Sequence, residues 1–221
     1  MRYVCFADEP FRQQHWEVQP AWLRYPDARR NSRISKILAH IFLETKYSIY
    51  HDACLNLQVP AKQLIDQFLV TNDVAMFRHP CRKSVYEEMD ACRTLGIGYG
   101  PEMETQVERY KAHNIQGLWS GGVIIRRHTD LVALMNELWW TEYIEGCPRD
   151  QIAFPMARAA ANITVTTIKD EILQNPYFAF NFHGWHRRNQ EEFADYFKKE
   201  EDKWKRLKTL CPLPEQEPDA K

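Results

Sequence analysis

The first residues whose types and spacing suggest chemistry are a histidine and an aspartate in "YSIYHDACLNL", the stretch from Tyr47 to Leu57. Aromatic and β-branched residues open this stretch as a strand, so His51 and Asp52 stand at its end. A carboxylate at a strand end of an α/β protein can bind a divalent cation that in turn holds a phosphate. The alternative is a turn aspartate that caps the next backbone amides. Neighbouring strand positions face opposite sides, so His51 and Asp52 are not expected to share one ligand.

A basic segment, "RRNSRISK", precedes that strand in the chain. Its residues Arg29, Arg33 and Lys36 lie along one face of a helix if the helix begins early enough. The arginines can then pair with phosphate oxygens, and the alternative is a solvated helix start. Cations at a helix N-terminus oppose the helix dipole, and this small penalty favours an anionic ligand.

Two later segments could contact a ligand. Gly121 and Gly122 lie inside the strand-like "WSGGVIIRRH", where paired glycines mark either the close approach of a ligand or a β-bulge. Asp150 and Gln151, in "CPRDQIAF", begin an otherwise apolar helix. They can face a ligand with several hydroxyls, or Asp150 can be a helix N-terminal carboxylate and nothing more.

Two histidines, His183 and His186, lie three residues apart in the aromatic segment "FHGWHRR". Histidines at this spacing can share a metal ion if the segment turns. The alternative is a structural role for each histidine in an aromatic loop. The spacing leaves both interpretations open.

Strands and helices alternate along the chain, which predicts an α/β fold with a mixed central sheet flanked by helices. Strands are expected at 2–8, 47–51, 73–79, 117–128 (broken at the paired glycines) and 162–168. Helices are expected at 31–44, 60–69, 83–96, 101–114, 129–144, 148–160 (interrupted near Pro155) and 189–210, with 11–28 and 178–188 irregular. Ligands bind at the carboxyl ends of strands in open sheets, so Asp8, His51 and Asp52 are expected on one edge.

The composition excludes several classes of protein. The chain has 221 residues, 44% hydrophobic, which predicts one domain at 1–188, a charged helix at 189–210 and a flexible tail at 211–221. Lys and Arg (29) nearly balance Asp and Glu (30), so no global field attracts nucleic acid or membrane, and no run is long enough for a membrane span. Six scattered cysteines without a C-x-x-C pair indicate thiols in a reducing, cytoplasmic compartment. The charged helix is interpreted as a solvated surface or a contact in a homo-oligomer.

The order of these motifs resembles the GT-A glycosyltransferase-like family first catalogued as domain of unknown function 616, which includes plant mucilage and turgor-regulating proteins. The segments that carry the resemblance are "RRNSRISK", "YHDACLNL", "SGGVIIRRH" and "RDQ", within residues 2–160. More distantly, the order is similar to family 8 of the retaining glycosyltransferases, which use a nucleotide sugar and Mn²⁺. The resemblance therefore implies a single GT-A-like, Rossmann-related domain.

The resemblance also implies a role for each residue on the donor side. These roles are contact with the nucleotide base and ribose (Ala7, Asp8), with the nucleotide or its phosphates (Arg33, Lys36), with the donor sugar (Gly121, Gly122), with sugar hydroxyls (Asp150) and with the reacting centre (Gln151). The donor implied is a nucleotide sugar, with UDP as the nucleotide, and the acceptor is a glycan or another hydroxyl compound.

The metal site implied by the resemblance is only partly present. Asp52 matches the first aspartate of a D-x-D motif, and His183 matches the late histidine that completes the metal site in distant relatives. The third position of the motif is Cys54, and a thiol is a poor ligand for Mn²⁺ or Mg²⁺, which prefer oxygen. The sequence therefore leaves open a metal held by fewer protein ligands, a metal-independent activity, and a lost activity.

The leading functional hypothesis is transfer of a sugar from a nucleotide sugar to an acceptor hydroxyl, with a cation at Asp52 and His183 stabilising the departing diphosphate. No well-placed general base appears in the sequence, and the distant similarity implies retention. A second hypothesis is a non-catalytic domain that binds a nucleotide sugar or a partner, which Cys54 supports. A third is a metal-dependent hydrolase that uses Asp52, His183 and His186.

Overall fold

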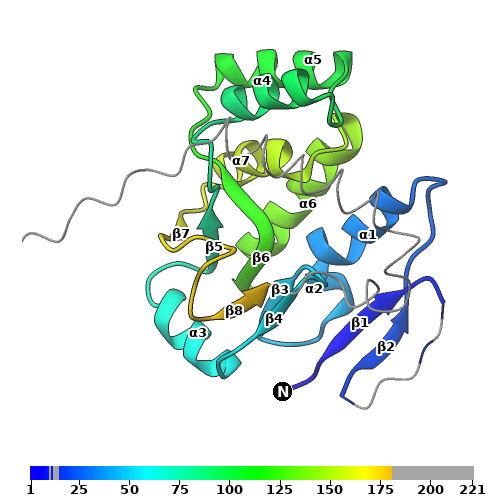
Figure 1. Cartoon of the computed structure of the whole chain (residues 1–221), viewed down its shortest axis with the longest axis vertical. Coiled ribbons are helices and arrows are strands. Elements are labelled where there is room, and N and C mark those ends of the chain that lie inside the picture. Colours follow the sequence, from blue (N-terminus) through cyan, green and yellow to red (C-terminus); the bar gives the residue numbers. More distant parts are fainter. Residues whose placement is uncertain (10, 12–14, 181–221) are drawn as a thin grey trace, which may run out of the picture.

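A four-stranded mixed sheet forms the centre of the molecule (Figure 1). The computed structural model describes residues 1–9, 11 and 15–180. The strands lie in the order β3 (Tyr47–His51), β6 (Trp119–Arg127), β5 (Val74–Arg78) and β7 (Val165–Ile168). β6 is antiparallel to both of its neighbours, and β7 is parallel to β5. The carboxyl ends of β3, β5 and β7 therefore share one edge with the beginning of β6, and the predicted mixed α/β fold is confirmed.

Two small sheets lie outside the central one. β1 (Val4–Ala7) pairs in parallel with β2 (Glu17–Pro20), and β4 (Leu55–Leu57) pairs antiparallel with β8 (Phe178–Phe180). The prediction that 11–28 is irregular throughout was wrong for β2, and the predicted loop at 178–180 is a strand. Both strands are short, and the partner of β8 lies 121 residues earlier, at Leu57 for Phe178, so local composition gives little sign of them.

Seven helices are present in the described part of the chain: α1 (Ala28–Ile37), α2 (Ala39–Phe42), α3 (Ala61–Phe68), α4 (Val85–Leu95), α5 (Pro101–Ala112), α6 (Asp130–Glu145) and α7 (Asp150–Ala160). Several helix ends are stabilised by caps. The hydroxyls of Ser84 and Thr129 accept hydrogen bonds from the first turns of α4 and α6, and Gly96 ends α4 at a φ of 65°. None of these helices has the length and apolar character that crossing a bilayer requires.

The helix predicted at 31–44 begins earlier and divides in two. Asp27 is its cap, accepting a hydrogen bond from the backbone of Arg29. Asn31, the first residue of the predicted helix, is buried in the first turn, and its amide donates to the carbonyl of Tyr25. Because α1 begins at Ala28, Arg29, Arg33 and Lys36 all lie within it and share one face, as their spacing predicts. The helix ends at Ile37, and α2 follows after Leu38.

Two predicted interruptions are absent. β6 continues through Gly121 and Gly122, and the irregularity appears as a shift of its register with β5 between Met76 and Arg78. α7 continues through Pro155, where the ring removes one backbone donor without ending the helix. β6 and α7 are therefore each one continuous element.

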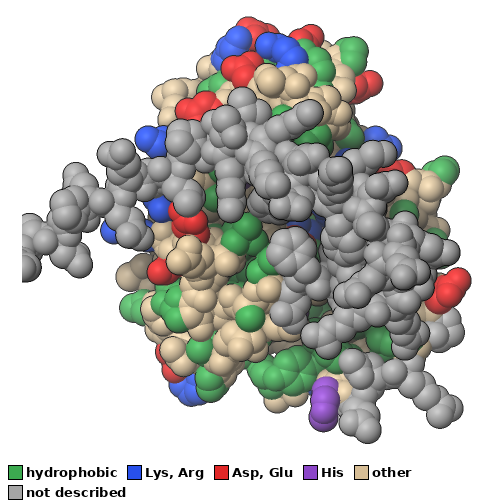
Figure 2. Space-filling view, viewed as in Figure 1, with side chains coloured by type: hydrophobic (Ala, Val, Ile, Leu, Met, Phe, Trp, Pro, Cys, Tyr) green, Lys and Arg blue, Asp and Glu red, His purple; other side chains and the backbone are tan. Residues whose placement is uncertain are grey.

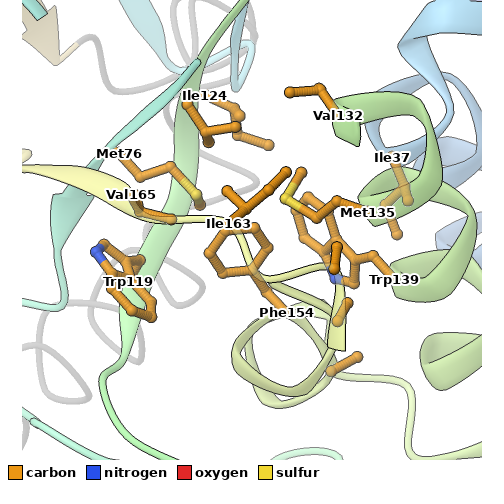
Figure 3. Close-up of a cluster of buried hydrophobic side chains, with 14 of the residues drawn as sticks. Ile37, Met76, Trp119, Ile124, Val132, Met135, Trp139, Phe154, Ile163 and Val165 are labelled. Atoms are coloured by element: carbon orange, nitrogen blue, oxygen red, sulfur yellow. The ribbon is translucent and has the colours of Figure 1, made fainter. Parts of the chain in front are cut away.

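The hydrophobic core lies on both faces of the sheet. One cluster, drawn in Figure 3, packs Met76 and Ile124 of the sheet against Met135 and Trp139 of α6 and Phe154 of α7. The second cluster covers the other face with α3 and β8, and a third fills the space between α4, α5 and α7. Figure 2 shows acidic and basic side chains together over α4 and α5, so charges of both signs mix on that surface. These layers fix the helices α1 and α7 against one side of the sheet.

A fully buried arginine joins the sheet to α1. Arg126 of β6 has no exposed surface, and its guanidinium donates to the carbonyls of Lys36 (2.7 Å) and Ile37 (3.0 Å) and to Oδ1 of Asn136 (3.1 Å). These three partners are neutral oxygens, and burial lowers the pKa of Arg126. The cation lies at the carboxyl end of α1, where the helix dipole favours positive charge.

Candidate functional site

Asp150 is the centre of a buried ion cluster at the start of α7. Its Oδ2 lies 2.6 Å from Nζ of Lys36 and 3.2 Å from Nε of Arg33, both on α1. The Lys36 side chain is 3% exposed and that of Asp150 is 10% exposed. Burial alone would raise the pKa of the Asp150 carboxyl, but attraction to Lys36 and Arg33 lowers it to about 2. The carboxylate is therefore ionised at neutral pH.

The cluster continues to Asp52 through Tyr50. Nζ of Lys36 lies 5.0 Å from the centre of the Tyr50 ring, a cation–π contact. The hydroxyl of Tyr50 donates to Oδ1 of Asp52 at 2.6 Å, and burial together with that carboxylate raises the pKa of Tyr50. Asp150, Lys36, Tyr50 and Asp52 thus form one row of contacts across α7, α1 and β3.

Asp52 follows β3 directly, as its position in the sequence predicts. Its backbone N–H donates to the carbonyl of Gly122, and its own carbonyl accepts from Leu55 in the next turn. The carboxylate of Asp52 accepts a hydrogen bond from the Tyr50 hydroxyl. Among the described contacts, no following backbone amide donates to this carboxylate. The turn is closed by backbone groups, so the described contacts do not use the carboxylate as a cap.

The side chains of His51 and Asp52 have different partners, as the alternation of a strand predicts. Its ring is 6.0 Å from the rings of Trp16 and Phe178, measured between centroids. Its Nδ1 lies 3.1 Å from the carbonyl oxygen of Asp52. These contacts place His51 among aromatic side chains on the side of the small sheets.

The paired glycines let the polar groups approach β6 closely. A Cβ added at Gly121 would lie 3.0 Å from Nζ of Lys36 and 3.5 Å from Oδ2 of Asp150. A Cβ added at Gly122 would lie 2.8 Å from Cδ1 of Ile172 and 3.3 Å from Oδ2 of Asp52. Both interpretations of the glycines therefore have a structural counterpart, since the register with β5 also shifts here.

We expect Gly122→Ala to destabilise the protein more than Gly121→Ala. The new methyl at Gly122 meets a packed isoleucine, and overpacking of this kind costs about 1–3 kcal/mol. The methyl at Gly121 meets the end of the Lys36 side chain, which can shift by a few tenths of an ångström. Urea unfolding of the two variants measures the difference, and a larger loss at Gly121 would contradict this account.

Arg149 and Arg29 are basic residues of the site that the sequence did not single out together. A Cβ added at Gly98 would lie 3.5 Å from Cδ of Arg149 and 3.8 Å from Nη1 of Arg29, so the two arginines meet beside Gly98. Nη2 of Arg149 donates to Oε1 of Gln151 at 3.3 Å. Arg149 immediately precedes Asp150 and Gln151, and this adjacency was the only signal in the sequence.

A second ion cluster is centred on Glu88 and includes Arg149. Glu88 of α4 is fully buried and accepts hydrogen bonds from the guanidinium groups of Arg82 and Arg149. Nε2 of His79 lies 3.7 Å from Oε2 of Glu88, and Nδ1 of His79 accepts from the backbone of Arg82 at 3.1 Å. Burial opposes ionisation of Glu88, but Arg149 and Arg82 outweigh it and lower the pKa. Burial also lowers the pKa of His79 to about 4.

We expect the free energy of unfolding to fall as the pH drops from about 7 to about 4.5. In the unfolded chain a histidine takes up its proton near the ordinary value of 6.5, whereas burial lowers the folded pKa of His79 and of His128 to about 4. The unfolded state therefore binds more protons in this interval, so stability is lost as the pH falls through it, by up to about 1.4 kcal/mol per pH unit for each histidine. Urea unfolding at three pH values measures the slope.

The control for that slope is His79→Asn, whose side-chain oxygen can replace Nδ1 as the acceptor for the backbone of Arg82. This variant does not titrate at the position and is expected to show a shallower dependence on pH. An unchanged slope in His79→Asn and in the matching His128→Gln variant would contradict the prediction.

Ala7 and Asp8, two further predicted site residues, do not belong to this cluster. Ala7 and Asp8 lie at the end of β1, and Asp8 is exposed. β1 pairs with β2, so Asp8 does not share the edge of the central sheet with Asp52, contrary to the expectation. His183 and His186 lie outside the described residues, as does the predicted helix at 189–210.

The described residues do not by themselves form a metal site. Asp52 supplies one carboxylate, and no group of three His, Cys, Asp or Glu side chains able to hold a metal occurs in residues 1–9, 11 and 15–180. Cys54 is half-buried, and burial raises the pKa of its thiol, which keeps it protonated. The predicted metal ligands Asp52 and His183 therefore stay a prediction.

Comparisons with known proteins give the following matches. The family model described as TOD1/MUCI70, glycosyltransferase-like domain, matches residues 16–177. "Probable hexosyltransferase MUCI70" of Arabidopsis thaliana is 31% identical over 190 residues, 78% of this chain and 32% of that protein. "Alkaline ceramidase TOD1" of the same plant is 27% identical over 205 residues, 84% of this chain and 43% of that protein. The chain thus spans about a third of the first relative and less than half of the second.

Proposed function

The chain belongs to the TOD1/MUCI70 family of glycosyltransferase-like domains, and from this membership we propose that it transfers a sugar from a nucleoside diphosphate sugar to an acceptor hydroxyl. Membership confirms the resemblance drawn from the sequence motifs. The observation that carries the proposal is the buried carboxylate of Asp150, shared by Arg33 and Lys36 beside Gly121. Asp150, which can accept hydrogen bonds from sugar hydroxyls, thereby lies beside Arg33 and Lys36, which can pair with phosphate oxygens.

An excess of positive charge supports an anionic ligand at this edge. The two ion clusters, taken with Arg29 beside Gly98 and Asp52 beside Tyr50, comprise five cations (Arg29, Arg33, Lys36, Arg82, Arg149) and three carboxylates (Asp52, Glu88, Asp150). The side chains of Arg33 and Arg149 are 27% and 25% exposed, so both reach the surface of the site. A guanidinium pairs with phosphate oxygens through two parallel hydrogen bonds, and a diphosphate supplies such oxygens.

Asp150 fits the binding of sugar hydroxyls better than proton transfer. A carboxyl with a pKa of about 2 is ionised at neutral pH, so it accepts hydrogen bonds and is a weak base. Lys36 and Arg33 hold the carboxylate in one orientation, and a fixed acceptor can align the donor sugar for attack. Gln151, which accepts from Arg149, follows it on the same helix turn.

The chemical difficulty of the reaction is the departure of the diphosphate, because negative charge builds on its leaving oxygen. Arg33 of α1 lies 3.2 Å from Oδ2 of Asp150, and Arg149 directly precedes Asp150 at the start of α7. Cations fixed in place before the reaction stabilise that charge without reorganising. These residues therefore supply the electrostatic part of catalysis.

A divalent cation at Asp52, when bound, would neutralise diphosphate charge. The steps above do not depend on it, since the described residues supply only part of a ligand set. Binding of Mn²⁺ or Mg²⁺ therefore stays a prediction. The retaining outcome, the cytoplasmic location and the homo-oligomer also stay predictions. Titration of each cation in the assay below, and the anomeric configuration of the product by NMR, test the first two.

The experiment that tests the function is calorimetric titration with UDP, GDP, ADP and CDP, with and without Mn²⁺, followed by a turnover assay on the matching nucleotide sugars. We expect one diphosphate to bind and Arg33→Met to weaken it about tenfold, the size of a lost charge-assisted contact. The matched control is Arg109→Met, because Arg109 is also paired with a carboxylate, Glu142, but lies on α5 outside the site. Failure of every diphosphate to bind would refute the proposal.

Two rival functions are decided by the same samples. Binding of a diphosphate without turnover of any donor would favour a non-catalytic domain, which the thiol of Cys54 in the D-x-D position supports. The second relative is named an alkaline ceramidase, so hydrolysis of ceramide and of a phosphate ester is assayed in parallel. Turnover there without a sugar donor, abolished by His186→Ala, would favour a hydrolase.

A further inference from the structure

Glu88 is a buried carboxylate that the proposed reaction does not use directly. It lies on α4, has no exposed surface, and divides its two oxygens between two guanidinium groups. Oε2 accepts from Nε of Arg82, and Oε1 accepts from Nη2 of Arg149. A side chain without exposed surface does not touch a substrate, so its effect on the site must pass through a neighbour.

Arg149 is the neighbour that leads from Glu88 to the site. It is the residue before α7, with an extended backbone and a side chain that makes no cap hydrogen bond to the helix. Its stem packs beside Gly98, and the same Nη2 that bonds Glu88 also donates to Gln151. One nitrogen thus connects the buried carboxylate on α4 with a residue of the candidate site.

We propose that Glu88 is a positioning residue that fixes the guanidinium of Arg149 beside Asp150 and Gln151, where it meets the donor diphosphate. The proposal rests on the proposed function for the identity of the ligand. Without Glu88, the long side chain of Arg149 would sample several rotamers, and ordering it on binding would weaken affinity. With Glu88, one nitrogen of the guanidinium is held by a charge-assisted hydrogen bond.

The charge of the second ion cluster agrees with this role. Glu88 neutralises one of its two arginines, and His79 beside it is uncharged at neutral pH because burial lowers its pKa to about 4. Cys92, on the same helix, donates its S–H to Oε1 of Glu88. The cluster therefore orients Arg149 while leaving a net positive charge toward the site.

The first test is a double-mutant cycle with UDP as the ligand, measured by calorimetry on the full chain. Glu88→Gln is expected to weaken UDP binding about tenfold in the wild-type background and hardly at all in an Arg149→Met background, because the two residues act as one unit. Glu142→Gln is the matched control, since Glu142 also accepts from an arginine but lies outside the site, and UDP affinity should not change. An equal loss in both backgrounds would overturn the proposal and leave the function standing.

The second test does not depend on any ligand. Phenylglyoxal modifies accessible arginines, and mass spectrometry of the digested chain gives the rate at Arg149. We expect Glu88→Gln to raise that rate severalfold, because the guanidinium loses a charge-assisted bond. Arg109, which donates to both oxygens of Glu142, is the internal reference. An unchanged rate at Arg149 would overturn the positioning role, even if UDP fails to bind and the proposed function falls.

A conservative variant keeps both tests decisive if Glu88→Gln does not fold. Glu88→Asp retains the negative charge, but its side chain is one methylene shorter, so the carboxylate lies farther from the two guanidinium groups. It is expected to fold, to release Arg149 and to weaken UDP binding in the same background-dependent way. A merely structural role for Glu88 predicts instead that Glu88→Asp lowers the melting temperature with no change in UDP affinity or in Arg149 modification.

Discussion

Asp150→Asn is expected to lower the free energy of unfolding by about 3–5 kcal/mol, because it leaves the buried ammonium of Lys36 without its carboxylate. Arg33 loses the same partner but is exposed enough to regain water. For a chain of this size the loss corresponds to a fall in melting temperature on the order of 10 °C. Thermal unfolding followed by circular dichroism measures it, and transferase activity is expected to be lost as well.

The double variant Asp150→Asn with Lys36→Met separates the two effects. Removing the unpaired ammonium takes away most of the cost of burial, so the double variant should be more stable than Asp150→Asn alone. Its activity should stay lost, since no carboxylate remains at that position to accept sugar hydroxyls. A double variant that is less stable than the single one would refute the assignment of the Lys36–Asp150 pair as the source of the effect.

Trp139→Ala is the second change with a large expected effect, a destabilisation of about 3–5 kcal/mol from the cavity it leaves. Trp139 has no exposed surface and stacks edge-on with Phe154 at 4.7 Å between ring centroids. Its Nε1 also donates to the backbone carbonyl of Asp150 at 2.8 Å, so the indole fixes the start of α7. Urea unfolding measures the loss.

Two comparisons make that prediction specific. Trp140→Ala removes the same side chain one position along, where it is only half-buried, and should cost clearly less. Trp139→Phe fills most of the space but cannot donate to the carbonyl of Asp150, so it should weaken donor binding more than its loss of stability suggests. Equal costs for Trp139→Ala and Trp140→Ala would contradict the packing described here.

The sequence predicts those elements whose signals are local. The strand expected at 47–51 is confirmed with the same bounds, because aromatic and β-branched residues fill it. The helices expected at 83–96 and 129–144 are confirmed as α4 and α6, whose first turns are capped by the hydroxyls of Ser84 and Thr129. The start of α1 was mispredicted since Asp27 and Asn31 are both good caps, and only tertiary contact with Tyr25 turns Asn31 inward.

Features that depend on contacts between distant residues could not be predicted in this way. Nothing within β1 indicates that it pairs with β2 instead of the central sheet, and so Asp8 was expected beside Asp52. Burial of Lys36 follows from its pairing with Asp150, 114 positions later, and a lysine on a helix is ordinarily expected to be solvated. Glu88 and Arg149 are 61 residues apart, and neither segment alone suggests their ion pair.

The buried guanidinium of Arg126 has a consequence for motion. It ties the last carbonyls of the helix that carries Arg33 and Lys36 to the strand that carries the paired glycines. Sliding that helix along the sheet would strip a charged donor and two acceptors of their bonds in a dry interior, at about 1–3 kcal/mol for each group. Helix and strand therefore move as one rigid body, and this wall of the site is preorganised before a donor arrives. Any closure around a bound donor must be hinged elsewhere, in segments that this brace does not hold.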